Sequence, residues 1–155
     1  MTRVFLYAPQ DFRNLCLLAR TLEAFGCLEC GVFDPHGLVR EKYGRARTRE
    51  LRVVSAGAFE KIRWTRVDEP ERFFAECGGR VIMTVADPAA TPLSKHLFAQ
   101  TDLIVFGPEG RGLPADVVAS GALAVTIPLA GVTKSLNLVV AVGIVLFEVQ
   151  RQLAA

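Results

Sequence analysis

The stretch Asp102-Leu-Ile-Val-Phe-Gly-Pro-Glu-Gly-Arg-Gly-Leu-Pro114 decides the fold of this chain. Its apolar run predicts a buried strand over residues 103–106. The run ends abruptly at Gly107, and Gly110 and Gly112 follow, so we expect a tight loop whose backbone N–H and C=O groups are uncovered for a ligand. The sequence therefore predicts a cofactor site at the end of this strand.

The order of these glycines argues against a dinucleotide-binding protein. Gly107, Gly110 and Gly112 reverse the spacing of the G-x-G-x-x-G fingerprint. Too little chain follows them for a Rossmann half with its acidic ribose contact. A nucleotide-dependent oxidoreductase is therefore a disfavoured alternative.

Strands and helices alternate along the rest of the chain. Apolar runs predict further strands over residues 4–7, 28–33, 81–85 and 124–127. Helical spacing predicts helices over residues 13–25, 69–77, 116–120 and 136–153, and the charged segment 39–51 fits another helix. The small residues 55–58 predict a turn or a helix start. This alternation predicts one α/β domain over residues 1–155, with a mostly parallel sheet and helices on both faces.

The helix predicted over residues 136–153 is apolar almost all round. A helix on one side of a sheet normally keeps a polar stripe, so this one must be covered on more than one face. Burial between two subunits explains this best and predicts a homodimer. The alternative is a central helix of a monomer.

Composition indicates a soluble globular protein, with 51% hydrophobic and 22% charged residues in 155. The N-terminus lacks a signal peptide, and no apolar run reaches membrane-spanning length, so we expect a cytoplasmic protein without a membrane partner. Cys27 and Cys30 form a C-x-x-C pair, but no second pair follows and the chain has only two histidines. We therefore expect buried structural thiols and no metal.

The net charge is only +2, but basic residues gather in one window. This window contains only two acidic residues, Glu41 and Glu50. Its basic residues are Arg40, Lys42, Arg45, Arg47, Arg49 and Arg52. Lys61, Arg63 and Arg66 follow around Trp64. Such a cluster fits a phosphate backbone, although a solvated helix face is the simpler interpretation of a charge run.

Three blocks together resemble the SpoU branch of the SPOUT methyltransferases, which use S-adenosylmethionine to methylate the ribose 2′-hydroxyl of tRNA or rRNA. The first block is Asn14-Leu-Cys-Leu-Leu-Ala-Arg20 with Glu23-Ala-Phe-Gly26. The second is Val105-Phe-Gly-Pro-Glu-Gly-Arg-Gly-Leu-Pro114, and the third is Ile127-Pro-Leu129 with Ser135-Leu-Asn137. Ser55-Ala-Gly-Ala58 is similar to a family segment between them. The resemblance covers nearly the whole chain.

The resemblance implies a domain with a C-terminal trefoil knot, in which the last helix passes through an earlier loop. It also implies S-adenosylmethionine as cofactor, held by loops that follow three strands. By position, the cofactor-binding residues are Thr84, Gly107, Glu109, Gly110, Ile127, Ser135 and Leu136. Adenine needs an apolar slot and a few backbone hydrogen bonds, which these residue types supply.

The resemblance assigns catalysis to Arg20, with Asn14, Glu109, Ser135 and Asn137 beside it. A free guanidinium is a poor base, with a pKa above ~12. We therefore prefer that Arg20 orients and polarises the ribose hydroxyl, although a strongly perturbed Arg20 acting as the base stays open. Asn14 and Asn137 would position Arg20 or the ribose, and Glu109 would hold the loop or Arg20.

One residue departs from the family pattern, because Cys16 stands where a glycine is usual. A catalytically inactive RNA-binding protein of the same fold therefore stays an alternative. The first strand begins almost at Met1, so no separate RNA-binding extension is expected. A single domain of this kind resembles the family members that modify the wobble nucleotide of tRNA. We therefore expect tRNA rather than rRNA as the substrate, and we do not expect DNA binding. The basic window and Arg111 would contact phosphates, and Trp64 or Tyr43 would stack on a base.

Overall fold

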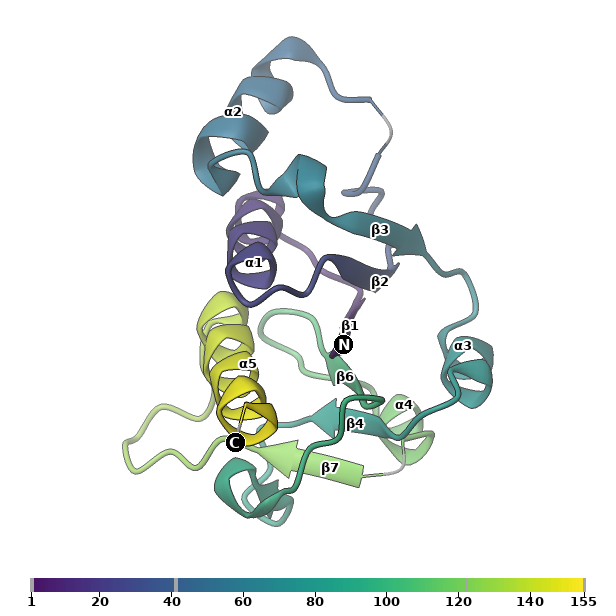
Figure 1. Cartoon of the computed structure of the whole chain (residues 1–155), viewed down its shortest axis with the longest axis vertical. Helices are drawn as coiled ribbons and strands as arrows, with labels where there is room; N and C mark the ends of the chain where they lie inside the picture. The colour runs from purple at the N-terminus through teal and green to yellow at the C-terminus, as the bar shows by residue number, and fades with distance from the viewer. Residues whose placement is uncertain (1, 41, 122, 155) are drawn as a thin grey trace.

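A seven-stranded parallel sheet forms the centre of the molecule. The computed structural model describes residues 2–40, 42–121 and 123–154. The strands lie in the order β3-β2-β1-β6-β4-β7-β5, and each neighbouring pair is parallel. Figure 1 shows this sheet from β3 to β7. Their bounds are β1 Arg3–Tyr7, β2 Glu29–Phe33, β3 Arg63–Arg66, β4 Val81–Thr84, β5 Thr91–Pro92, β6 Leu103–Phe106 and β7 Leu123–Thr126. The α/β prediction is confirmed.

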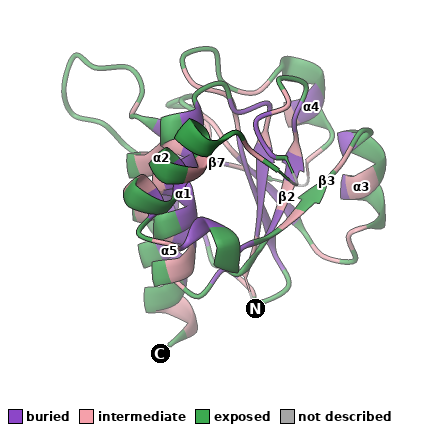
Figure 2. Cartoon of the chain, turned by 90° about the horizontal axis from the view of Figure 1, so that it is seen from above, coloured by how far each residue is buried: buried purple, intermediate pink, exposed green. Residues whose placement is uncertain are grey.

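Helices cover both faces of the sheet. They are α1 Phe12–Ala24, α2 Arg45–Ser55, α3 Pro70–Glu76, α4 Ala115–Ala119 and α5 Leu138–Leu153, with 3₁₀ turns η1 Phe59–Lys61 and η2 Leu93–Lys95. Helices α1, α2 and α5 contribute to one buried cluster, whereas α3 and α4 contribute to a second cluster with Phe74 and Val117. Figure 2 shows the buried strands between these two groups of helices.

Local sequence explains the central elements. All four residues of β6 are buried, as expected for a strand covered on both faces. Helix α1 begins where the Asp11 side chain accepts a hydrogen bond from the Asn14 backbone N–H at 2.7 Å. It ends before Gly26, whose φ of +71° suits the left-handed position after a helix.

The charged helix was predicted at the wrong position, and strands β3 and β5 were not predicted. The charged helix begins at Arg45 rather than at residue 39, because the buried Asp34 carboxylate binds the backbone N–H groups of Leu38 and Val39 at 2.9 and 2.8 Å. These hydrogen bonds fix residues 34–39 in a turn, and this conformation is incompatible with a helix that begins at residue 39. Strand β3 was not predicted at all, because its charged residues Arg63 and Arg66 hid an edge strand beside β2.

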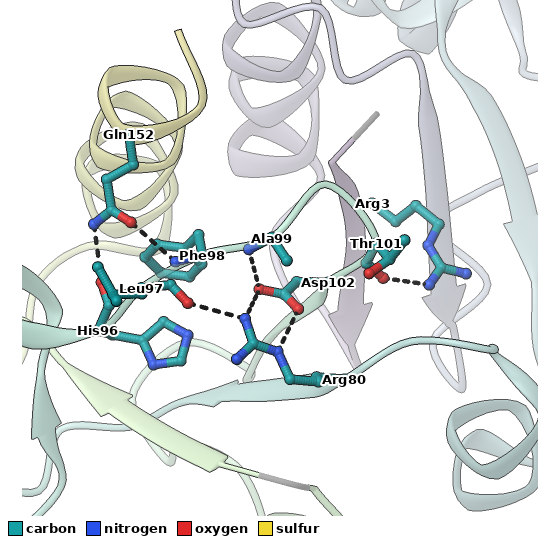
Figure 3. Close-up of polar contacts among 9 residues, drawn as sticks. All are labelled: Arg3, Arg80, His96, Leu97, Phe98, Ala99, Thr101, Asp102 and Gln152. Carbon is teal, nitrogen blue, oxygen red and sulfur yellow. Dashed lines mark hydrogen bonds and ion pairs between the residues drawn. The ribbon is translucent and has the colours of Figure 1, made fainter. Parts of the chain in front are cut away.

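The amino ends of the strands are sealed by side chains that bind backbone groups (Figure 3). Arg80 makes a two-pronged contact with the buried Asp102 carboxylate, with both nitrogen–oxygen distances 2.8 Å, and donates to the Leu97 carbonyl at 2.9 Å. Burial raises the pKa of Asp102, but hydrogen bonds from Arg80 and the Ala99 N–H outweigh it and hold that pKa below its ordinary value.

The last turn of α5 is tied to the same loop. The Gln152 side chain accepts from the Phe98 N–H and donates to the His96 carbonyl, both at 2.9 Å (Figure 3). The His96 ring is buried, and its Nε2 has no partner among the described residues. Burial and the Arg80 guanidinium lower the pKa of His96, against the opposing charge of Asp102. This loop therefore fastens the C-terminal helix to the sheet.

The cysteines behave as structural residues. Cys16, Cys27 and Cys30 are buried free thiols, and Cys77 is half-buried. Burial raises the pKa of Cys16 and that of Cys27 to about 11. A raised pKa keeps a thiol protonated, and a protonated thiol is a poor nucleophile and a poor metal ligand.

Within residues 2–40, 42–121 and 123–154, no helix has the length and apolar character needed to cross a membrane. The threading of α5 through an earlier loop concerns the path of the chain, which strand order does not test, and stays a prediction.

Candidate cofactor and RNA site

A pocket of about 940 Å³ opens at the carboxyl ends of β4, β6 and β7. Its walls are the segments that follow these three strands, together with Leu138, Ala141 and Val145 of α5. Parallel sheets bind ligands at this edge, because the loops that follow several strands converge there. The volume lies at the upper end of the range for small-molecule and cofactor sites.

The pocket collects every residue predicted to bind the cofactor. These residues come from loops far apart in the sequence and are Thr84, Gly107, Glu109, Gly110, Ile127, Ser135 and Leu136. The structure therefore brings the second and third sequence blocks together. Their individual roles toward a ligand stay a proposal.

Gly107 is required by close backbone packing. A Cβ at this position would lie 2.7 Å from the Leu113 backbone nitrogen, inside van der Waals contact. Gly110 has a φ of +80°, which a side chain would strain. The glycines thus fold the loop tightly and bring its backbone to the wall of the pocket.

The lining combines apolar surface with a few charges. Ile127 and Leu136 offer apolar contact, while Asp87 and Glu109 bring carboxylates to the wall. The Thr84 hydroxyl donates to the Val105 carbonyl at 2.9 Å and holds the end of β4 against β6. This set fits a cofactor with an aromatic base and a cationic group, as S-adenosylmethionine has.

Glu109 joins the pocket to the start of α1. One carboxylate oxygen accepts from the Asn14 side-chain amide at 3.2 Å, and the other accepts from the Gln10 backbone N–H at 3.0 Å. The first and second sequence blocks therefore meet at this corner. Among the described residues no bond joins Glu109 to Arg20, and Glu109 ties its own loop to the residues at the start of α1.

Arg20 and Asn137 lie outside the pocket lining of a single chain. Arg20 is exposed on the later half of α1, away from the Asn14–Glu109 corner. Asn137 precedes α5 and its side chain accepts from the Val139 N–H at 2.8 Å, so it acts as a helix cap here. The predicted catalytic set is therefore brought together only in part.

Cys16 does not disturb the start of α1. Its side chain is fully buried among core residues, and its pKa is influenced by Glu50 and Arg47 of α2 in addition to burial. Two residues along a helix correspond to a rotation of about 200°, so Cys16 and Asn14 lie on opposite sides of α1. The thiol therefore packs toward α2 and leaves the Asn14–Glu109 corner open.

The basic window maps mainly to α2 and the loop before it. Arg45, Arg47, Arg49 and Arg52 lie on α2, whereas Arg40 and Lys42 precede it. Arg52 pairs with Glu60 at 3.0 Å, and the Arg40 Nε donates to the Gly37 carbonyl at 2.6 Å. Arg111 lies apart from this group, in the lining of the pocket.

Stacking of a base on Trp64 or Tyr43 stays a prediction, and both side chains already have partners within the fold. The Trp64 ring lies 4.9 Å from the Phe59 ring, centroid to centroid, and its Nε1 donates to the Phe59 carbonyl. The Tyr43 hydroxyl donates to the Leu38 carbonyl and accepts from the Arg40 N–H. Both aromatic side chains are used in packing.

Sequence reasoning missed Asp87, Lys134 and Gln10. Asp87 and Lys134 line the pocket from different loops, and Gln10 binds Glu109 through its backbone. A signal was available for Lys134, which directly precedes Ser135, and for Asp87, which follows a predicted strand. No side-chain pattern announces a backbone contact such as that of Gln10.

Fold and pocket together define an α/β domain with a cofactor-sized pocket at the carboxyl edge of one parallel sheet. The SpoU rRNA methylase family model matches residues 1–147. The chain belongs to this SpoU family.

Curated relatives act on both main classes of structured RNA. The chain is 31% identical to the 23S rRNA (guanosine-2′-O-)-methyltransferase RlmB of Acinetobacter baylyi, over 92% of this chain and 56% of that protein. It is also 31% identical to the tRNA (guanosine(18)-2′-O)-methyltransferase of Thermus thermophilus, over 90% of this chain and 69% of that protein. The chain thus spans about half to two thirds of the length of these relatives.

Solved structures confirm the fold. A chain from a study of the 2-OH methylation of C/U34 on tRNA superposes with a TM-score of 0.85 at 30% identity, covering 99% of this chain and 97% of that one. An AdoMet-bound rRNA methyltransferase from Sinorhizobium meliloti gives a TM-score of 0.80 at 25% identity, covering 99% of this chain and 57% of that one.

Proposed function

We propose that this chain is an S-adenosylmethionine-dependent methyltransferase that modifies the ribose 2′-hydroxyl of RNA, with tRNA as its substrate. One observation carries the proposal. The pocket at the carboxyl edge gathers the residues of two separate sequence blocks, and Glu109 links it to the Asn14 of a third. Membership of the SpoU family supports the same reaction.

The residues present fit the cofactor. Gly107 lets the loop fold tightly at the wall of the pocket, and Ile127 and Leu136 offer apolar contact to adenine. Asp87 and Glu109, with Arg111 and Lys134, bring charges of both signs to the lining, as the sulfonium, amino and carboxylate groups of the cofactor require. When bound, S-adenosylmethionine supplies an activated methyl group, so the protein needs neither a metal nor a covalent intermediate. The chain's own residues then have to align a hydroxyl and assist loss of its proton.

Arg20 is the proposed residue for that task. A guanidinium beside the ribose orients and polarises the hydroxyl, and Asn14, held by Glu109, positions the nucleotide at the corner of the pocket. Because Arg20 lies outside the pocket of its own chain, a second copy is part of the proposal.

The exposed face of α5 supports a homodimer. Val142, Val145 and Val149 are buried against the core, but Val140, Ile144 and Phe147 remain 49%, 37% and 61% exposed. These three follow helical spacing and form one apolar stripe. A second copy packed on this stripe would remove it from water.

Substrate choice rests on similarity to solved structures. The chain studied for C/U34 methylation on tRNA superposes with a TM-score of 0.85 at 30% identity, whereas the rRNA methyltransferase from Sinorhizobium meliloti gives 0.80 at 25%. This favours tRNA, including its wobble position, and leaves rRNA as the second candidate. An inactive RNA-binding protein is the third.

Labelled methyl transfer from S-adenosylmethionine to unfractionated tRNA and, separately, to rRNA tests the proposal. We expect a 2′-O-methylated nucleoside in tRNA, and the Arg20→Ala variant to lose about 100-fold or more of its rate while binding S-adenosylmethionine like the unsubstituted protein. Product in rRNA alone would replace the proposed substrate. Unchanged turnover of Arg20→Ala would remove Arg20 from the mechanism, and cofactor binding without transfer to either RNA would indicate an inactive binding protein.

A further inference from the structure

Arg47 differs from the other arginines of α2 in the direction it faces. Arg47, Leu51 and Ser55 recur every four residues, and Leu51 and Ser55 are the buried residues of this helix. Arg47 therefore continues the stripe that packs on α1, one turn beyond its buried part. Arg45, Arg49 and Arg52 follow a different stripe, turned toward solvent.

At the end of this stripe, Arg47 stacks on an aromatic ring. Its guanidinium carbon lies 4.5 Å from the centroid of the Phe12 ring. Phe12 is buried, whereas Arg47 is an exposed residue that solvent can reach. A planar cation with one face supported and the other open is a surface on which a nucleobase can stack.

A column of aromatic rings holds this platform in place. Phe12 contacts Tyr43 at 5.4 Å, Tyr43 contacts Phe59 at 6.1 Å and Phe59 contacts Trp64 at 4.9 Å between ring centroids. The Tyr43 hydroxyl is fixed by two backbone hydrogen bonds. Because the support is already ordered, stacking on Arg47 costs little side-chain entropy.

The platform lies beside the pocket corner but not in it. Phe12 and Asn14 share the first turn of α1, and Asn14 is held by Glu109 of the pocket lining. Their side chains are about 200° apart around the helix, which places them on opposite sides of a cylinder about 10 Å wide. A base on Arg47 thus belongs to a nucleotide near the one modified, not to the modified nucleotide itself.

We propose that Arg47, supported by Phe12, is a base-stacking platform for an unpaired nucleotide that flanks the modified one in the RNA substrate. This inference rests on the proposed RNA substrate and gives Arg47 a different role from a phosphate contact. Phosphate contacts need charge alone, whereas stacking needs a planar group. The two roles are therefore separable by a substitution that keeps the charge.

The test compares lysine and alanine substitutions at Arg47 and at Arg49, a matched position two residues along the same helix. Affinity for unfractionated tRNA is measured by filter binding over a series of salt concentrations, and KM for tRNA is measured by methyl transfer. We expect R47K to weaken binding and raise KM by about tenfold with an unchanged salt slope, since base stacking is lost but charge is kept.

At Arg49 we expect the reverse pattern. R49K retains most of the affinity, and R49A lowers the salt slope by about one, as loss of one phosphate contact does. Equal thermal midpoints of R47K and the unsubstituted protein exclude a folding defect. If R47K binds tRNA as tightly as the unsubstituted protein, the proposal that Arg47 stacks on a base is overturned, whereas the proposed methyltransferase function stands. If the unsubstituted protein binds neither tRNA nor rRNA, both are overturned.

Discussion

The two edges of the same sheet are built in opposite ways. At the amino edge, charged and amide side chains of Arg3, Arg80, Asp102 and Gln152 bind the ends of neighbouring loops (Figure 3). At the carboxyl edge, glycines and the loops that follow the strands surround a pocket of about 940 Å³. The sealed edge fixes the strands so that the open edge can present backbone to a ligand. Stability and binding are thus assigned to different ends of the same strands.

The largest effect should come from the sealed edge. Arg80→Met leaves the Asp102 carboxylate, whose side chain is 1% exposed, without its ionic partner. Breaking a buried pair in this way costs about 3–5 kcal/mol, so we expect a loss of that order in the free energy of unfolding measured with urea. Arg72→Met breaks an exposed pair with Glu76 and is the control, with a much smaller loss expected. Equal losses in the two variants would contradict the assignment.

The next effect should appear at the open edge and in binding rather than in stability. Gly107→Ala places a Cβ 2.7 Å from the Leu113 nitrogen and must displace the loop. We expect at least about tenfold weaker binding of S-adenosylmethionine by isothermal titration calorimetry, corresponding to about 1.4 kcal/mol. Gly131→Ala is the matched control, because an added Cβ there meets nothing within 4 Å. An equal loss in both glycine variants would mean that the close approach at Gly107 is not what shapes the pocket.

The smallest effect should be a pH dependence of the sealed edge. The pKa of buried His96 is below its ordinary value of 6.5, so the unfolded chain takes up this proton more readily than the folded one. Stability from neutral His96 is therefore present above about pH 6.5 and falls as the pH drops below it.

His96→Gln should flatten this dependence. Urea midpoints at pH 7 and pH 5.5 should differ less in His96→Gln than in the unsubstituted protein, and exposed His36→Gln serves as control. Ionised Asp102 also contributes stability that is lost as the pH falls, but at lower pH. Because the pKa of Asp102 is depressed, this stabilisation fades only below about pH 4. An unchanged difference in His96→Gln would show that other groups set the pH dependence.

Sequence reasoning reached the open edge better than the sealed one. The apolar run 103–106 and the glycines after it predicted the central strand and the pocket loop, because strand burial and tight turns leave local signals. The family resemblance added Thr84, Ile127 and Ser135 to the pocket, because these residues lie far from Gly107 in the sequence and no local pattern connects them to it. The ties at the sealed edge join residues such as Arg80 and Leu97 across a loop and leave no periodic pattern.

The failures have separate physical causes. Strand β3 was missed because an edge strand tolerates exposed charged residues, which also suit a phosphate-binding segment. The packing of Trp64 on Phe59 left no signal in the sequence, because only the folded chain brings the two rings together. The position of Arg20 outside the pocket was beyond sequence reasoning, since spacing along a helix does not say which pocket a side chain reaches.

The register of the central strands has a consequence for how the chain folds. Val4 of β1 pairs with Ile104 of β6, so the middle of the sheet closes across 100 residues (104 minus 4). Pairings of such separation form slowly, because a long loop must be ordered first. During synthesis at about 5–20 residues per second, β1 would wait roughly 5–20 seconds for its partner. Until then its edge is open to other chains, so the nascent protein is most vulnerable to misassembly before β6 emerges.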